Sequence, residues 1–126
     1  MSQPQETSPH PPLSFAQQRL WFLASADNAV LYNLPIAWRL RGATDTASLR
    51  AALADVVTRH ESLRTVFPAV EGQPHQRVIE ESAAHVPWAV IECTAAELSA
   101  AVEEEARRPF DLGCELPVRA SLFVVG

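Results

Sequence analysis

Arg59-His60-Glu61-Ser62-Leu63-Arg64-Thr65-Val66-Phe67 closes the run of sequence that decides the fold, and this run begins at Ala47. Within this run, five residues follow one another at alternating steps of four and three. This spacing places them on one stripe of a helix with about 3.6 residues per turn. The stripe consists of Leu49, Leu53, Val56, His60 and Leu63. We therefore expect a helix over Ala47–Arg64, laid on a sheet by this face.

The two ends of this helix are marked by residue type. Asp45 or Thr46 is suited to cap its start, because a short oxygen-bearing side chain accepts from the first free N–H groups. The β-branched start of Thr65-Val66-Phe67 and the proline after it end the helix and begin an extended segment. Arg59 and Arg64 lie on the flanks of the apolar stripe, where a long stem is buried while the charge points elsewhere.

Composition bounds the class of protein. A chain of 126 residues that is 48% hydrophobic is long enough for one domain with a core. Its net charge of -5 includes no basic stripe, which argues against a nucleic-acid or anionic-membrane surface. No apolar stretch approaches the roughly 20 residues of a membrane span, and no signal peptide is recognisable. We expect a cytoplasmic location, with Cys93 and Cys114 as free thiols.

The sequence divides near residue 13. Residues 1–12 are rich in proline and polar residues and predict a flexible leader or linker, whereas residues 13–126 predict the folded part. Ser14 and Gln17 form a capping-box pattern that opens a helix. Apolar residues occupy most of its circumference, so we expect it to be largely buried, and Arg19 within it then needs a partner.

The remaining elements follow in order along the chain. The expected elements are a half-buried strand over 34–40, a hairpin over 65–80 turning at Glu71-Gly72-Gln73-Pro74, a strand over 88–92, a helix opened by the capping box Thr94-Ala95-Ala96-Glu97 and broken at Pro109, and a strand over 118–125. They predict an α/β sandwich with a mixed or antiparallel sheet and helices packed on it. Because the last strand grows more apolar toward its end, we expect the N-terminal part of a larger domain. The alternative is a complete small domain with a terminal edge strand.

No residue of the chain stands out as a catalyst. His10, His75 and His85 are expected on the surface, and His60 is expected as a buried structural histidine, because none has a nucleophile at a recognisable spacing. The run Glu103–Glu105 is a solvated helix face rather than a metal site, and the four scattered glycines form no phosphate loop. From pattern alone, the sequence predicts neither a catalytic residue nor a metal ligand.

Two long stretches carry a family resemblance. Ser14-Phe15-Ala16-Gln17-Gln18-Arg19-Leu20-Trp21-Phe22-Leu23 resembles the first signature of nonribosomal peptide synthetase condensation domains, and residues 59–67 resemble the second. Three shorter stretches also resemble the family, namely Tyr32-Asn33-Leu34-Pro35, Arg108-Pro109-Phe110-Asp111-Leu112 and Pro117-Val118-Arg119-Ala120. The resemblance covers nearly everything after the leader. It implies a fold like chloramphenicol acetyltransferase, of which two halves form a V, with this chain as most of the first half.

The resemblance also implies an activity for the larger protein. In this family the amine of an aminoacyl thioester attacks an acyl or peptidyl thioester to form an amide bond. The implied partners are the upstream and downstream peptidyl carrier proteins, which present both substrates on phosphopantetheine arms, and the adenylation domain of the same synthetase. No cofactor is expected to bind this chain directly. Both signatures resemble the subtype that joins two L-configured building blocks.

The catalytic signature of the family, H-H-x-x-x-D-G, does not occur in residues 1–126. Its histidine positions or deprotonates the attacking amine, and we expect it after Gly126, so that these residues alone are inactive. By resemblance, Arg64 is the expected ion-pair partner of the aspartate in that signature, and Arg19 a second supporting contact near the substrate tunnel.

A second hypothesis is a non-catalytic, truncated condensation-like module that docks a carrier protein or a neighbouring domain. In either case we expect the isolated chain to be poorly soluble or oligomeric, because its terminal strand is uncovered.

Overall fold

The computed structural model describes residues 11–24 and 33–126. Within these ranges the α-helices are α1 (Phe15–Ala24), α2 (Thr46–Arg59) and α3 (Leu98–Ala106), and the short 3₁₀ helices are η1 (Glu61–Arg64) and η2 (Glu81–Ala83). The strands are β1 (Thr65–Val66), β2 (Ala69–Val70), β3 (Gln73–Pro74), β4 (Arg77–Val78), β5 (Trp88–Cys93) and β6 (Ala120–Val125). Residues 1–10, with His10, lie outside the described residues.

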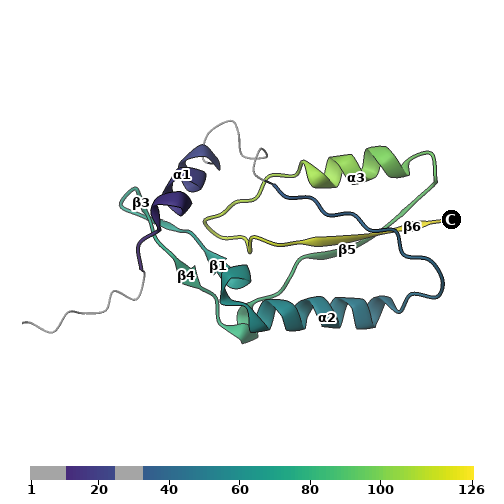
Figure 1. The fold of residues 1–126 in the computed structure, drawn as a ribbon, viewed down its shortest axis with the longest axis horizontal. Helices are drawn as coiled ribbons and strands as arrows, with labels where there is room; N and C mark the ends of the chain where they lie inside the picture. Colours follow the sequence, from purple (N-terminus) through teal and green to yellow (C-terminus); the bar gives the residue numbers. More distant parts are fainter. Residues whose placement is uncertain (1–10, 25–32) are drawn as a thin grey trace, which may run out of the picture.

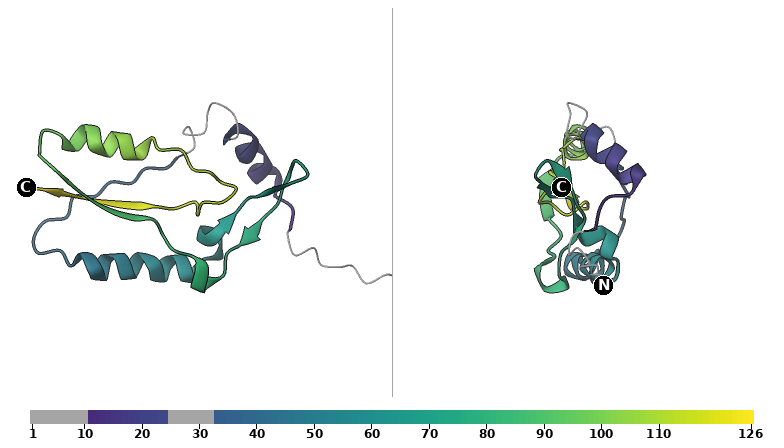
Figure 2. Two further views of the ribbon diagram at one scale, coloured as in Figure 1. Left: turned by 180° about the vertical axis from the view of Figure 1, so that it is seen from behind. Right: turned by 90° about the vertical axis from the view of Figure 1, so that its left-hand side faces the viewer.

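The longest strands form a parallel pair. β5 pairs with β6 in the register Trp88↔Ala120 to Cys93↔Val125, and α3 is the connection between them. Parallel neighbours need such a crossover, because a tight turn cannot bring the chain back to the same end of the sheet. Helices α3 and α2 lie on opposite sides of this pair (Figures 1 and 2). The expected strands over 88–92 and 118–125 and the helix between them are confirmed.

The predicted hairpin is also present. β1 pairs with β4, and β2 with β3, all antiparallel. The turn between β2 and β3 has Glu71 at φ 53 and Gly72 at φ 79. Two successive positive φ values are typical of the two-residue turns whose twist matches a hairpin. The described strands thus form three separate two-stranded sheets, two antiparallel and one parallel, so both kinds of pairing are present but not within one sheet.

Both predicted capping boxes are formed in the structure. The Ser14 N–H donates to Gln17 Oε1 at 2.8 Å while the Gln17 N–H donates to Ser14 Oγ at 3.2 Å. The same exchange joins Thr94 and Glu97, at 3.1 and 3.3 Å. Each box satisfies donors that the first turn of a helix leaves free. Asp45 caps α2 by accepting from the Ser48 N–H at 3.2 Å.

The core of the described residues is small and lies where α2 meets the hairpin. Val57 is 1% exposed, and with Val66 and Leu116 it forms the buried cluster. The half-buried side chains packed against this cluster are Leu63, Ile79, Ala84, Val86 and Val118. The core therefore joins α2, which contains Val57, to β1, which contains Val66.

The prediction of an apolar stripe on the helix over Ala47–Arg64 is wrong in part. The helix ends at Arg59, and His60 is its exposed C-cap with φ -111, not a buried histidine on the stripe. Leu49 and Val56 are exposed, whereas Val57 is buried. The face that a helix buries is set by the neighbours available to it, and the hairpin meets the Val57 side.

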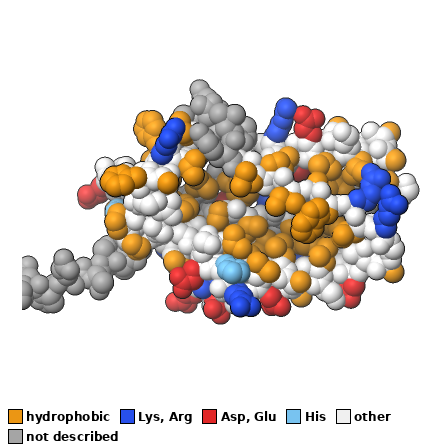
Figure 3. Space-filling model, in the orientation of Figure 1, with side chains coloured by type: hydrophobic (Ala, Val, Ile, Leu, Met, Phe, Trp, Pro, Cys, Tyr) orange, Lys and Arg blue, Asp and Glu red, His pale blue; other side chains and the backbone are white. Residues whose placement is uncertain are grey.

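Residues 34–40 do not form the strand that was predicted for them. Its backbone is in no ladder with a described strand, and its apolar residues are exposed, with Leu34 at 90% and Trp38 at 84%. An extended segment becomes a strand only when a neighbour takes its N–H and C=O groups. Figure 3 shows hydrophobic side chains gathered across the middle of one face of the molecule.

Two further burial predictions are corrected. No residue of α1 is buried, and Phe15 is 91% exposed, so the expectation of a largely buried first helix is wrong. The helix lies at the hairpin end of the molecule and meets it from one side only (Figure 1). Glu105 does not lean toward solvent with Glu103, because it accepts from Ser121 Oγ of β6 at 2.8 Å.

Candidate functional site

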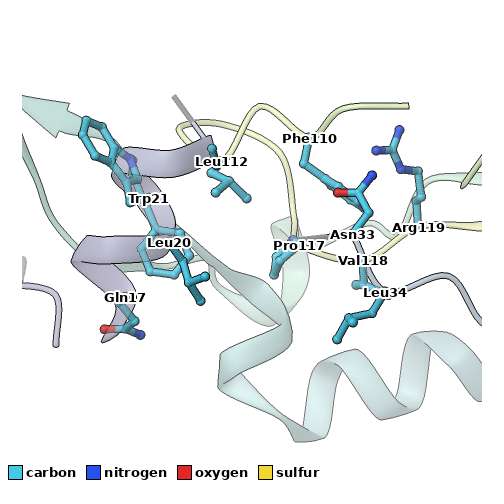
Figure 4. A pocket seen from close by; sticks show the side chains of 12 residues that line it. Gln17, Leu20, Trp21, Asn33, Leu34, Phe110, Leu112, Pro117, Val118 and Arg119 are labelled. Atoms are coloured by element: carbon cyan, nitrogen blue, oxygen red, sulfur yellow. The ribbon is translucent and has the colours of Figure 1, made fainter. Parts of the chain in front are cut away.

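A cavity of about 350 Å³ lies between α1 and the loop that connects α3 to β6 (Figure 4). The first signature contributes Gln17, Leu20 and Trp21 to its lining, and the second contributes Phe67. A volume of this size falls within the range of small-molecule sites in proteins, roughly 300–1,000 Å³.

The three shorter stretches that resemble the family line the same cavity. Asn33 and Leu34 come from the first of them, and Phe110 and Leu112 from the second. The third contributes Pro117, Val118 and Arg119. Every stretch that carries the resemblance therefore meets at this one place in the fold, although the stretches are far apart in sequence.

Helix α1 is fixed at the cavity by polar bonds from its own signature. Trp21 Nε1 donates to the carbonyl oxygen of Phe67 at 3.3 Å. Gln17 Oε1 accepts from the Ser14 N–H and from Gln76 Nε2, the latter at 3.1 Å. Gln76 also reaches the segment before α1, since its N–H donates to the Pro11 carbonyl at 2.8 Å. These bonds hold a largely exposed helix against the hairpin.

The opposite wall is organised by the carbonyl oxygen of Arg108. It accepts from Asn33 Nδ2 at 2.9 Å and also from Arg119 Nη2. Asn33 Nδ2 donates a second bond to the Ala106 carbonyl at 3.2 Å. The segments of Asn33 and Arg119, which are distant from each other in sequence, are thus both tied to the end of α3.

Arg119 also holds the ring that forms part of this wall. Its guanidinium carbon lies 3.7 Å from the centroid of the Phe110 ring, in cation–π geometry, and Nη2 donates to the Pro109 carbonyl at 3.0 Å. Partial burial lowers the pKa of Arg119, and the nearby charge of Arg108 lowers it further. The Arg119 side chain therefore holds the Phe110 ring and the end of α3 in place at the cavity wall.

Arg64 lies outside this cavity, at the junction of η1 and β4. It is 8% exposed, and its Nη1 donates to the Ile79 carbonyl at 2.8 Å. Its Nη2 lies 3.9 Å from a carboxylate oxygen of Glu61 and of Glu81, both of which are exposed. Its Nε is buried and has no hydrogen-bond partner among the described residues. A buried donor left unpaired is costly, so this atom marks an incomplete environment.

Arg19, the other predicted site residue, is exposed on α1. No described residue pairs with it, and it does not line the cavity. The structure therefore does not bring Arg19 and Arg64 together.

The histidines and cysteines form no catalytic arrangement among the described residues. His60 and His85 are exposed. His75 is half-buried rather than on the open surface as expected, and no described residue pairs with its Nδ1. A hydrogen bond with Asp111 raises the pKa of the Cys114 thiol, which keeps it protonated and weakly nucleophilic. Cys93 is also a free thiol.

Residues 11–24 and 33–126 contain neither a candidate metal site nor a candidate membrane span. No group of three His, Cys, Asp or Glu side chains there has the arrangement of a metal site. No helix in the same ranges is both long and apolar enough to cross a bilayer.

Residue-by-residue reasoning missed Gln17, Asn33 and Arg119 as organisers of the cavity. A sequence signal for these three residues was present, because each residue lies in a stretch that resembles the family. The sequence does not show which residues pair, because the hydrogen bond from Asn33 to Arg108 spans 75 residues.

Comparisons with known proteins agree with the geometry. The condensation-domain family model matches residues 7–126. An isonitrile lipopeptide synthase of Mycobacterium tuberculosis is 54% identical over 116 residues, which is 89% of this chain and 5% of that protein. A dimodular nonribosomal peptide synthase of Bacillus subtilis is 47% identical over 91% of this chain and 5% of its own length.

A solved structure shares the fold. In the complex of the X-domain and OxyB from teicoplanin biosynthesis, a chain that is 36% identical superposes with a TM-score of 0.82. The match covers 100% of this chain and 26% of that one. The chain thus spans a small part of each of these three proteins. Its helices and strands agree with the N-terminal half of a chloramphenicol-acetyltransferase-like fold. With 120 of 126 residues matched by the family model, the chain belongs to the condensation-domain family.

Proposed function

We propose that this chain is the N-terminal part of a condensation domain that forms amide bonds in a nonribosomal peptide synthetase. The substrates are a carrier-bound acyl or peptidyl thioester and a carrier-bound aminoacyl thioester, both on phosphopantetheine arms. The observation that carries the proposal is the convergence of all five family stretches on one cavity. The partners are then two peptidyl carrier proteins and the adenylation domain of the same synthetase, in the cytoplasm.

Arg64 is proposed as a positioning residue for the catalytic loop. Its buried, unpaired Nε and its weak contacts to two exposed carboxylates leave it able to take a carboxylate partner. The aspartate of H-H-x-x-x-D-G, which we expect in the sequence after Gly126, would supply that carboxylate. Breaking a buried pair of this kind from one side costs about 3–5 kcal/mol. Arg19 is exposed and is proposed as a supporting contact at the tunnel.

The experiment uses the complete condensation domain, with synthetic aminoacyl and acyl pantetheine thioesters as substrates and amide product as the readout. The domain is expected to turn over, and a change of the signature histidine to alanine is expected to abolish product without unfolding. Residues 1–126 alone are expected to give no product. A complete, folded domain that binds carrier protein but forms no amide would instead favour the docking module.

The Arg64 assignment has its own test in the same domain. Arg64→Ala and the change of the signature aspartate to alanine are measured singly and together, by turnover and by unfolding. If the two groups pair, their effects are strongly non-additive, and Arg64→Lys recovers part of the loss. Strict additivity would show that Arg64 acts on something else.

A further inference from the structure

The loop of residues 107–119, which joins α3 to β6 and lines the cavity, is closed at its base by one side chain. Arg119 Nη2 donates to the carbonyl oxygens of Arg108 and Pro109, to the latter at 3.0 Å. The residues at the two ends of the loop are therefore in direct contact, although they lie 11 positions apart in sequence. Loops whose ends meet in this way are compact and pack on their own side chains.

Two further contacts hold the middle of this loop. The Phe67 N–H donates to the Leu112 carbonyl at 2.6 Å and so joins the loop to the segment after β1. The Asp111 N–H donates to Glu115 Oε2 at 3.2 Å, and the Glu115 N–H donates to the Asp111 carbonyl at 2.8 Å. These bonds fix the backbone on one side of Phe110. They do not act on its ring, which lies between them and the base of the loop.

The Phe110 ring takes its orientation from Arg119. The guanidinium carbon lies 3.7 Å from the ring centroid, while the edge of the same planar group donates to the two carbonyls. In Figure 4 both residues lie on the side of the cavity away from α1. Phe110 also lines a neighbouring cavity of about 260 Å³. A turn of this ring would therefore change the shape of both cavities.

Arg119 also fixes the start of β6. It immediately precedes this strand, and Ser121 within the strand donates from Oγ to Glu105 Oε2 of α3 at 2.8 Å. Residues two positions apart share one side of an extended chain, so β6 is tied to α3 twice on the same side. The catalytic signature of the family is expected beyond Gly126, after this strand. The cavity wall and the strand that leads to the signature thus share Arg119 as an anchor.

We infer that Arg119 is a positioning residue for the amide-forming reaction and acts through the Phe110 ring. The inference rests on the proposed function. The guanidinium already binds two carbonyls and the ring, so it acts on the substrates by holding the wall that orients them. Misplacement of reacting groups by about 1 Å can cost about 10²-fold in rate. A loss of orientation lowers kcat, whereas a loss of uniform binding raises KM.

The test uses the complete condensation domain with the aminoacyl and acyl pantetheine thioesters. Arg119→Met keeps an apolar stem and removes the guanidinium, and kcat is expected to fall about tenfold while KM changes by less than about threefold. Arg119→Lys keeps a charge for the ring but lacks the planar fork, so it is expected to recover part of kcat. A rise in KM with kcat unchanged would instead indicate direct substrate binding and overturn the inference.

Phe110→Leu tests whether Arg119 acts through the ring. Leucine keeps an apolar side chain but offers no aromatic face to the guanidinium. If the ring carries the effect, the double variant Arg119→Met with Phe110→Leu is expected to have a kcat within about threefold of the lower single variant. Two independent tenfold losses would multiply to about a hundredfold. That result would show that Arg119 and Phe110 act separately and would contradict the inference.

Hydrogen exchange measured by mass spectrometry on the same domain gives a readout that does not need turnover. Arg119→Met is expected to speed exchange of the N–H groups of residues 110–118 about tenfold, with β5 still protected. Arg107→Met is the matched control, because Arg107 is exposed, pairs with Glu103 at 2.8 Å and does not line the cavity. This control is expected to change neither exchange nor kcat.

The exchange data also separate the two ways in which the account can fail. Unchanged exchange of residues 110–118 in Arg119→Met would overturn the inference, and loss of protection in β5 would contradict a role confined to the loop. A wild-type domain that forms no amide, although Arg119 protects the loop, would refute the proposed function and leave the contact between Arg119 and the loop in place.

Discussion

At the scale of single residues, Arg64 combines deep burial with an incomplete set of partners. One strong bond, to the Ile79 carbonyl, joins the end of η1 to the residue after β4. The two carboxylates at 3.9 Å are exposed, and such pairs contribute little to stability because water screens them. The contribution of Arg64 within this chain therefore comes from the Ile79 bond and from packing of its stem.

Arg64→Met tests this account, because methionine keeps an apolar stem and removes the charge. The free energy of unfolding is expected to fall by about 1.5–3 kcal/mol, the range for a hydrogen bond from a charged donor. Urea denaturation followed by circular dichroism measures it. Arg59→Met, at the exposed end of α2, is the control and is expected to change stability by less than about 0.5 kcal/mol. Equal losses in both variants would contradict the account.

At the scale of the element, the turn between β2 and β3 carries a residue poorly suited to its conformation. Glu71 has φ 53, in the left-handed region that a side chain with Cβ disfavours, whereas Gly72 at φ 79 is suited to its place. Asparagine tolerates this region better than glutamate because its short side chain bonds to the local backbone.

Glu71→Asn is therefore expected to stabilise the hairpin, by up to about 1 kcal/mol. A higher melting temperature in a thermal scan is the expected observation. Glu80→Asn makes the same change at an exposed residue with φ -61, where no gain is expected. A gain of the same size at Glu80 would trace the effect to charge rather than to the turn.

The start of α2 predicts a dependence on pH. Hydrogen bonds from the Ser48 hydroxyl, and then from its backbone N–H, hold the pKa of Asp45 below its ordinary value of 3.8. A carboxyl group with a lower pKa in the folded state binds fewer protons there than in the unfolded chain. Its stabilising effect is thus present above pH 3.8 and is lost as pH falls through the folded-state pKa.

The melting temperature of the wild-type chain and of Ser48→Ala, measured from neutral to acid pH, checks this dependence. The wild-type advantage is expected to shrink below pH 3.8, because protonated Asp45 no longer accepts strongly from Ser48. A difference between the two proteins that stays constant across the acid range would show that the cap does not titrate with folding.

At the scale of the whole molecule, residues 34–40 form an exposed apolar segment. Leu34, Ile36, Trp38 and Leu40 share one side of an extended backbone and are all exposed. Monomeric proteins rarely expose contiguous apolar patches, because such surfaces associate. The segment is in no ladder with a described strand, so its backbone groups can also pair with another strand.

Trp38→Lys is expected to reduce self-association of the chain, with little effect on its fold. Sedimentation velocity over a range of protein concentrations reports the change directly. Ala37→Lys adds the same charge on the other side of the segment and is expected to help less. Equal improvement by both variants would mean that net charge, and not the apolar side, controls association.

What the sequence could predict depended on the range of the interactions. The capping boxes at Ser14 and Thr94 and the Glu71-Gly72 turn were predicted correctly, because their partners lie within a few residues. The buried face of α2 and the state of residues 34–40 depend on neighbours distant in sequence, and these predictions failed. The family stretches were recognised, but that Asn33 and Arg119 meet at one carbonyl was not visible without the fold.

The attachment of α1 has a consequence for the order in which the nascent chain folds. The bonds of α1 and of the segment before it reach Phe67 and Gln76, so their partners are synthesised about 46–65 residues later. At translation rates of about 5–20 residues per second, the helix leaves the ribosome roughly 2–13 s before it has a surface to dock on. During this interval the polar bonds from Trp21 to Phe67 and from Gln76 to Gln17 cannot form. The part of the protein that is made first is thus fixed in place only after the hairpin has emerged.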